Sequence, residues 1–168
     1  KGGHTNYKIR IADQPVHYHG DRTDILIAFD QRTIDENKSE LHQDSIVIYD
    51  SQFEPQGLEQ IPSRGIPMRE IAEKLGNPII KNMVAIGVTA AVLDLDPQPF
   101  FDSVASRFAS KGEKIIESNI GAIQQGYDYY RQHEKQRFRL PDQRTNEPLM
   151  LISGNEAAGF GALAGGCR

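Results

Sequence analysis

Two short apolar runs, at residues 25–29 and 46–49, stand out in the first third of the chain. Both are rich in β-branched residues and both are followed by an aspartate, which is typical of strands that are buried on both faces. The polar segment between them, residues 31–41, is long enough for a helix. A strand, a helix and a second strand in this order predict a parallel pair in an α/β domain.

The chain before these runs shows a different pattern. Apolar and polar residues alternate over residues 7–11 and again over residues 16–19, as in strands that are buried on one face only. The sequence Asp-Gln-Pro at 13–15 is turn chemistry, so we expect the two segments to form a hairpin. Residues 51–65 carry Pro and Gly and are expected to be mostly loop.

Four helices are predicted after this loop. Pro67 suits the first helical position of the first helix, and Gly76 follows its end. The second, residues 79–93, is apolar nearly all round, so it belongs inside a domain or at a subunit contact. Asp96 caps the third, and the fourth runs from about residue 113 to 133. The expected buried stripe of the third helix consists of Phe100, Phe101, Val104 and Phe108.

The last part of the chain predicts a domain boundary. Residues 134–147 are polar and charged and contain Pro141, as in an interdomain linker. A strand at 148–153 and a helix at 154–166 follow, and these two elements cannot form a core by themselves. We therefore expect a first domain at 1–133, a linker at 134–147 and the start of a second domain at 148–168.

Composition narrows the class of protein. Of the 168 residues, 38% are hydrophobic and 25% charged, a globular balance. The net charge of −4 argues against a general nucleic-acid binder. The single cysteine, Cys167, suits a reducing, cytoplasmic compartment and excludes an iron–sulfur cluster held by this chain alone, since such clusters use four thiolates. No signal peptide is visible, and no run approaches the ~20 apolar residues of a membrane span.

Two segments are candidate anion sites. Gly2 and Gly3 let the backbone approach a ligand closely, and Lys1 beside them can meet a negative charge. Lys81 lies near the start of the apolar helix, where free N–H groups favour an anion. The alternatives are a plain turn at Lys1 and an exposed lysine at Lys81.

Three other signals favour ordinary structural interpretations. His17 and His19 share one face of a predicted strand, but no third metal ligand stands at a convincing spacing, so an exposed hairpin is preferred. The basic residues in 131–139 indicate a solvated helix end. Residues 154–166 resemble a phosphate-binding turn, yet they lack the spacing of a P-loop or a dinucleotide fingerprint. No nucleophile–base set stands out, so these residues alone support an α/β domain with a candidate anion site.

Four segments, taken in order, resemble one family closely. The family is the 2-oxoacid:ferredoxin oxidoreductases, and the resemblance is to an α subunit with a γ domain fused ahead of the α part. It spans nearly the whole chain, and the fused arrangement is most like the 2-oxoglutarate branch (2-oxoglutarate synthase). The segments are KGGHTNYKIRI at 1–11, IKNMVAIG at 80–87, FASKGEKIIESN at 108–119 and LISGNEAAGFG at 151–161.

The resemblance implies a fold and a set of partners. The γ domain would be a three-layer α/β/α sandwich with a mostly parallel sheet, here lacking its first strand and helix because the glycine-rich turn between them is absent. The segment from residue 149 would open the pyrimidine-binding domain for thiamine diphosphate. The remainder of the α subunit, a β subunit carrying the diphosphate–Mg²⁺ site and a [4Fe-4S] cluster, and ferredoxin would be the partners in a cytoplasmic complex.

The implied reaction is coenzyme-A-dependent oxidative decarboxylation of a 2-oxoacid, with electrons passed to ferredoxin. This segment would hold no catalytic residue and no metal ligand. It would supply framework and coenzyme A contacts, first at Lys1 with Gly2 and Gly3 and second at Lys81. One alternative is a purely structural module whose apolar helix packs against partner subunits. Another is a free-standing nucleotide-binding protein, which would need a glycine-rich phosphate turn that this sequence lacks.

Overall fold

The computed structural model describes residues 4–12, 16, 18, 20–135, 138–140, 150 and 152–167. Within them the strands are β1 (Ile25–Ala28), β2 (Ile46–Asp50) and β3 (Ser63–Ile66). The helices are α1 (Gln31–Asn37), α2 (Met68–Lys74), α3 (Lys81–Val92), α4 (Gln98–Arg107), α5 (Glu113–His133) and α6 (Gly154–Ala164). Short 3₁₀ turns lie at Lys38–Glu40, Pro78–Ile80 and Ala109–Lys111.

The strands form one parallel sheet in the order β1-β2-β3. The predicted parallel pair is confirmed: Ile25 faces Ile46 in the register, and α1 connects the two strands. The third strand was missed, because the sequence Ser-Arg-Gly-Ile has no apolar alternation and only Ile66 is buried. Its pairing with β2, where Val47 lies opposite Ser63, makes it a strand.

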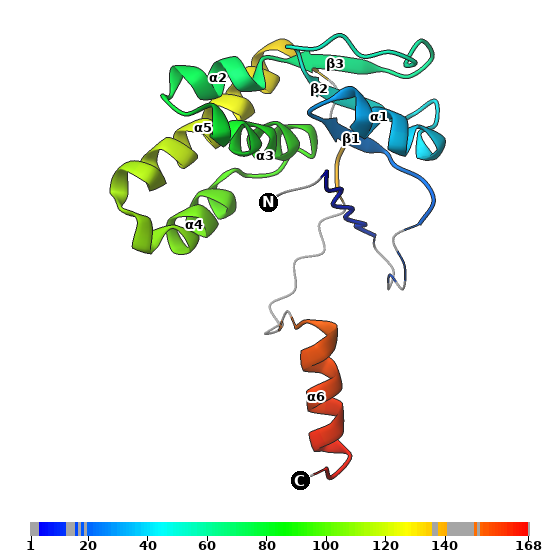
Figure 1. Ribbon diagram of the computed structural model, residues 1–168, viewed down its shortest axis with the longest axis vertical. Coiled ribbons are helices and arrows are strands. Elements are labelled where there is room, and N and C mark those ends of the chain that lie inside the picture. The colour runs from blue at the N-terminus through cyan, green and yellow to red at the C-terminus, as the bar shows by residue number, and fades with distance from the viewer. Residues whose placement is uncertain are drawn as a thin grey trace.

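Side chains of β2 point into two separate cores, and this creates three layers. Ile46 and Ile48 pack into the core formed with α2, α3 and α5. Val47 points the other way, into a smaller core that includes Ile34 of α1. Figure 1 shows the sheet between these layers. The predicted α/β/α architecture with a parallel sheet is therefore confirmed for the described residues.

Helices α3 and α5 pack with their backbones almost in contact. A Cβ atom added at Gly87 would lie 1.9 Å from the carbonyl oxygen of Ile123, and one added at Gly126 would lie 2.2 Å from that of Val84. Only glycine fits at these two positions. Most residues of α3 are buried, so the apolar helix lies inside the domain, which was one of its two expected positions.

The N-terminal hairpin is a wrong prediction. Residues 4–12, 16 and 18 form no strand, and Tyr7 is 90% exposed. Residues 13–15, 17 and 19 lie outside the described residues. Within the described part, the apolar side chains at 7, 9 and 11 are exposed, whereas polar side chains contact α1 and the 3₁₀ turn after it: His4 contacts Glu36 of α1, and Lys8 pairs with Glu40 of the turn. Polar and apolar side chains do alternate here, but the polar ones make the contacts with the rest of the chain and the apolar ones face solvent.

The later helices follow the sequence prediction with small changes. In α4 only Val104 of the expected stripe is buried and the phenylalanines are half-buried, while Asp96 accepts a hydrogen bond from the Gln98 N–H at 3.0 Å. The expected bounds of α5 are confirmed. Helix α6 begins at a capping box formed by Ser153 and Glu156. Every residue of α6 is exposed, and it lies away from the other elements (Figure 1).

The expected strand at 148–153 is not seen where it can be checked. Residues 150, 152 and 153 are not in a strand, and residues 148, 149 and 151 lie outside the described residues. Most of the expected linker at 134–147 is also outside them. The division into two domains therefore stays a prediction.

Candidate functional site

The carboxyl ends of the three parallel strands meet at one edge of the sheet. In the register, Ala28 at the end of β1 faces Tyr49, and Asp50 at the end of β2 faces Ile66 at the end of β3. Helix α1 starts directly after β1, and Lys81, the first residue of α3, lies beside Asp50. Ligands of open parallel sheets bind at this edge, so we take it as the candidate site.

Lys81, a predicted site residue, lies at this edge but is not a free cation. Its Nζ atom is 3.9 Å from Oδ2 of Asp50 and 4.9 Å from the centre of the Phe29 ring. The Asp50 side chain is only 3% exposed and otherwise accepts a long contact, 3.5 Å, from the Arg69 N–H. A buried carboxylate needs a partner to be stable. Lys81 therefore stabilises the buried Asp50 carboxylate, in addition to any contact that it makes with a ligand.

Asp30 caps the N-terminus of α1 at the same edge. Its Oδ1 atom accepts hydrogen bonds from the Thr33 hydroxyl at 2.7 Å and from the Thr33 N–H at 2.8 Å. These two bonds are the main reason why the pKa of Asp30 is lowered from its ordinary value, and the positive charges of His4 and Lys81 add to the effect. Asp30 is thus held as a carboxylate, and both His4 and Lys81 act on it.

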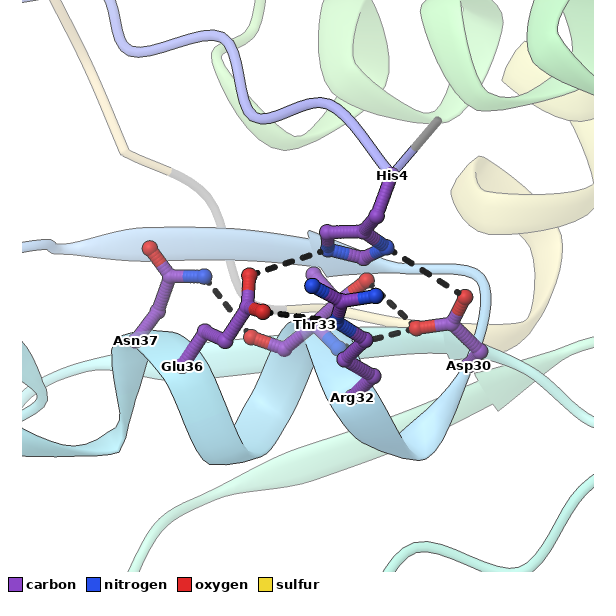
Figure 2. Close-up of polar contacts among 6 residues, drawn as sticks. All are labelled: His4, Asp30, Arg32, Thr33, Glu36 and Asn37. Atoms are coloured by element: carbon purple, nitrogen blue, oxygen red, sulfur yellow. Dashed lines mark hydrogen bonds and ion pairs between the residues drawn. The ribbon is translucent and has the colours of Figure 1, made fainter. Parts of the chain in front are cut away.

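His4 occupies the space between two acidic residues of this region. Its Nδ1 atom is 3.8 Å from Oδ2 of Asp30, and its Nε2 atom is 3.3 Å from Oε2 of Glu36. The other oxygen of Glu36 accepts a hydrogen bond from Arg32 at 2.6 Å. Figure 2 shows the imidazole lying across the start of α1, with a carboxylate at each ring nitrogen.

Sequence reasoning did not single out His4, Asp30 or Glu36. The available signals were the position of His4 directly after the glycine pair and that of Asp30 directly after the first apolar run. Asp30 and Glu36 come from a distant part of the chain, and only the fold brings them to the histidine.

The remaining predicted site residues are placed as follows. Lys1, Gly2 and Gly3 lie outside the described residues, but His4, which follows them, lies at the carboxyl edge. His17 and His19 also lie outside the described residues. In the described part of the chain, no three His, Cys, Asp or Glu side chains gather where they could hold a metal ion. Nor is any described helix both long enough and apolar enough to cross a bilayer.

A protein-family comparison decides the family of the chain. Residues 1–129 match the family described as pyruvate ferredoxin/flavodoxin oxidoreductase, which is well over half of the chain. The chain belongs to this family. The resemblance seen in the sequence is thereby confirmed.

Two curated relatives carry related names. Ketoisovalerate oxidoreductase subunit VorA of Methanothermobacter thermautotrophicus is 31% identical over 115 residues, which cover 67% of this chain and 24% of the relative. The α subunit of a 2-oxoacid:ferredoxin oxidoreductase from Sulfolobus sp is 22% identical over 213 residues, which cover 100% of this chain and 32% of the relative. The chain thus spans about a quarter to a third of the length of these proteins.

Two solved structures share the fold. One is 2-oxoglutarate:ferredoxin oxidoreductase from Magnetococcus marinus with 2-oxoglutarate, coenzyme A and succinyl-CoA bound. It has a TM-score of 0.81 and 25% identity, and the match covers 92% of this chain and 28% of that one. The other is the γ subunit of a keto/oxoacid ferredoxin oxidoreductase from Geobacter sulfurreducens, with a TM-score of 0.53 and 24% identity over 62% of each chain. This second match supports the fold alone.

Proposed function

We propose that the chain is part of a 2-oxoacid:ferredoxin oxidoreductase that decarboxylates a 2-oxoacid oxidatively, transfers the acyl group to coenzyme A and passes the electrons to ferredoxin. The observation that carries the proposal is the match, over 92% of the chain, to an enzyme whose structure contains 2-oxoglutarate, coenzyme A and succinyl-CoA. This match also makes 2-oxoglutarate the favoured substrate. The α-subunit relatives support a multi-subunit assembly.

The cofactors of this reaction would be held elsewhere in that assembly. A [4Fe-4S] cluster commonly takes four cysteine ligands, and this chain contains one cysteine, which is exposed. The described residues likewise form no acidic cluster that fits Mg²⁺. We therefore place thiamine diphosphate, Mg²⁺ and the cluster on the remainder of the α subunit and on a β subunit.

The contribution of this chain would be framework and charge for coenzyme A. Coenzyme A carries several phosphate charges, which lysine side chains can meet. At Lys81 the positive charge is already compensated by Asp50 and by nearby Asp30. We therefore propose Lys1, with Gly2 and Gly3 permitting close approach, as the stronger contact, and Lys81 as the weaker one.

A second candidate function is subunit assembly without ligand contact. It is favoured by large apolar side chains that are exposed on the segment before β1 and on α6, including Tyr7, Ile9, Phe160 and Leu163. Such surfaces are typical of interfaces between polypeptides. Helix α3 does not serve this purpose, because Val84 and its neighbours are buried within the domain.

Enzyme assays on the assembled protein test the proposed reaction. We expect ferredoxin reduction with 2-oxoglutarate that depends on added coenzyme A and yields the acyl-CoA product. Pyruvate and ketoisovalerate, offered to the same preparation, are expected to give a lower kcat/KM. Preference for either of them would overturn the substrate assignment, and full ferredoxin reduction without coenzyme A would overturn the reaction.

A further inference from the structure

Lys81 keeps its hydrogen-bond donors although its charge is compensated. Its Nζ atom lies 3.9 Å from Oδ2 of Asp50 and 4.9 Å from the centre of the Phe29 ring, and neither contact is a hydrogen bond. Within the part of the chain that the structure describes, no group accepts a hydrogen bond from this ammonium group. An ammonium group has three N–H donors. Because the side chain is 31% exposed, a ligand can reach them.

The same two contacts hold the ammonium group in one place. Phe29 follows β1 and packs against the larger core, and Asp50 ends β2 and is almost fully buried. Lys81, at the start of α3, is thus restrained by groups from two neighbouring strands. A flexible lysine side chain normally loses rotamer freedom when it binds a ligand. Here part of that loss has already occurred on folding, so a ligand contact at Lys81 costs less entropy.

The charges around Lys81 indicate which ligand atom fits. Two carboxylates, those of Asp50 and Asp30, act on this one ammonium group. Asp30 is ionised, because its bonds with Thr33 lower its pKa and the charge of Lys81 adds to that effect. Even a charged His4 would only bring these four groups to a net charge of zero. A phosphate therefore gains little here, whereas an uncharged oxygen can accept an N–H without repulsion.

We propose that Lys81 donates a hydrogen bond to an uncharged oxygen of the pantetheine arm of coenzyme A, and that Asp50 and Phe29 are positioning residues that hold its ammonium group. The inference rests on the proposed function and adds to it the part of coenzyme A that Lys81 contacts. The arm carries a hydroxyl group and amide carbonyls, which are acceptors without charge. The phosphates of coenzyme A have no favoured place beside Asp50 and Asp30.

Calorimetric titration of the assembled oxidoreductase tests the contact with two ligands. One is coenzyme A, and the other is 3′-phosphoadenosine 5′-diphosphate, which has all the phosphates of coenzyme A but lacks the arm. We expect Lys81→Met to raise the Kd for coenzyme A about tenfold, the lower end of what a hydrogen bond to a charged group provides. The Kd for the armless ligand should stay unchanged. An equal rise for both ligands, or an unchanged Kd for coenzyme A, would overturn the proposal.

Lys74→Met is the matched control for the loss of a lysine. Lys74 also pairs with a carboxylate, that of Glu70 at 2.7 Å, but it is the last residue of α2, whose first turn is the one near Asp50. The control should keep both Kd values of the parent. A rise like that of Lys81→Met would reveal a general effect of removing a lysine and would overturn the contact.

The positioning role is tested by the preference for coenzyme A over the armless ligand, the ratio of their Kd values. Asp50→Asn, which keeps the shape of the side chain, should lower this preference severalfold, and Phe29→Leu should lower it less. Because Asp50 acts through Lys81, Asp50→Asn should have no further effect on the preference when Lys81→Met is already present. A parent-like preference in Asp50→Asn, or a further loss in the double variant, would overturn the positioning role.

The parent complex distinguishes a failure of this inference from a failure of the proposed function. If the parent binds coenzyme A and forms acyl-CoA, but Lys81→Met binds both ligands as the parent does, only the contact at Lys81 fails. If the parent binds no coenzyme A, the proposed function fails, and the contact at Lys81 fails with it.

Discussion

Asp30 has two functions that follow from one side chain. Its carboxylate caps α1 through Thr33, and it also faces the ring of His4. The sequence pattern predicts a helix after β1, and an aspartate is a common N-cap residue. The contact with His4 joins residues distant in the chain, so no local pattern could predict it.

The lowered pKa of Asp30 makes the stability of the start of α1 depend on pH in the acid range. Because the folded protein lowers this pKa, the carboxylate stabilises the start of α1 above the ordinary aspartate value of about 3.9. That contribution is lost as the pH falls through the lowered value. We expect local protection of α1 amides to decrease with acid over this range, and Asp30→Asn, which still caps but cannot ionise, to lose this titration. Exchange measured from pH 5 to pH 2.5 checks it, and an identical acid profile in the variant would contradict it.

The site residues show what could be predicted at the residue scale. Lys81 was predicted from its place at a helix start, and the structure confirms that place. In the sequence, its ion-pair partner Asp50 was noted only as the aspartate that follows the second apolar run. A carboxylate at a strand end is a local feature, but its burial against an incoming helix depends on packing across the sheet.

At the scale of elements, the contact between α3 and α5 depends on glycine. The helices approach so closely that a Cβ atom at Gly87 or Gly126 would overlap a backbone carbonyl of the other helix. Backbone cannot move aside as a flexible side chain can. The sequence predicts both helices and favours Gly87 as a position of close helix packing, but it does not show that α5 is the partner or that Gly126 lies at the same contact.

Replacement of these glycines should destabilise the domain. We expect Gly126→Ala to lower the free energy of unfolding by about 1–3 kcal/mol or more, because the added methyl group must push the helices apart. Gly121→Ala is the matched control in the same helix, since its nearest neighbour would be a Leu75 methyl group at an ordinary 3.8 Å. It should be neutral or should gain up to about 1 kcal/mol from helix propensity. Thermal unfolding compares them, and equal midpoints for the two variants would contradict the packing account.

Elements with strong patterns were predicted well, and those defined by pairing were not. The buried strands β1 and β2 and the long helix α5 have apolar patterns that leave one interpretation. Strand β3 has almost no pattern of its own and is a strand because β2 pairs with it. Residues 7–11 have the pattern of a strand, but in the described part of the chain no strand pairs with them. Lys8 instead forms an ion pair with Glu40, in the 3₁₀ turn that follows α1.

At the scale of the whole molecule, the family and the architecture agree. The ordered motifs in the sequence, the match of residues 1–129 to the oxidoreductase family and the layered fold point to the same class of protein. The chain spans a quarter to a third of its curated relatives. Large apolar side chains are exposed on the first segment and on α6, and these surfaces carry the proposal of an assembly role.

Steady-state kinetics of Lys1→Ala in the assembled oxidoreductase tests the central claim most directly. A lysine–phosphate contact that is at least partly shielded is worth about 1.5–3 kcal/mol, so the KM for coenzyme A should rise about ten- to 160-fold. The kcat and the KM for the 2-oxoacid should stay unchanged, and Lys114→Ala, which removes an exposed lysine at the start of α5, should behave like the parent. An unchanged KM for coenzyme A in Lys1→Ala would contradict the account and favour a role in assembly alone.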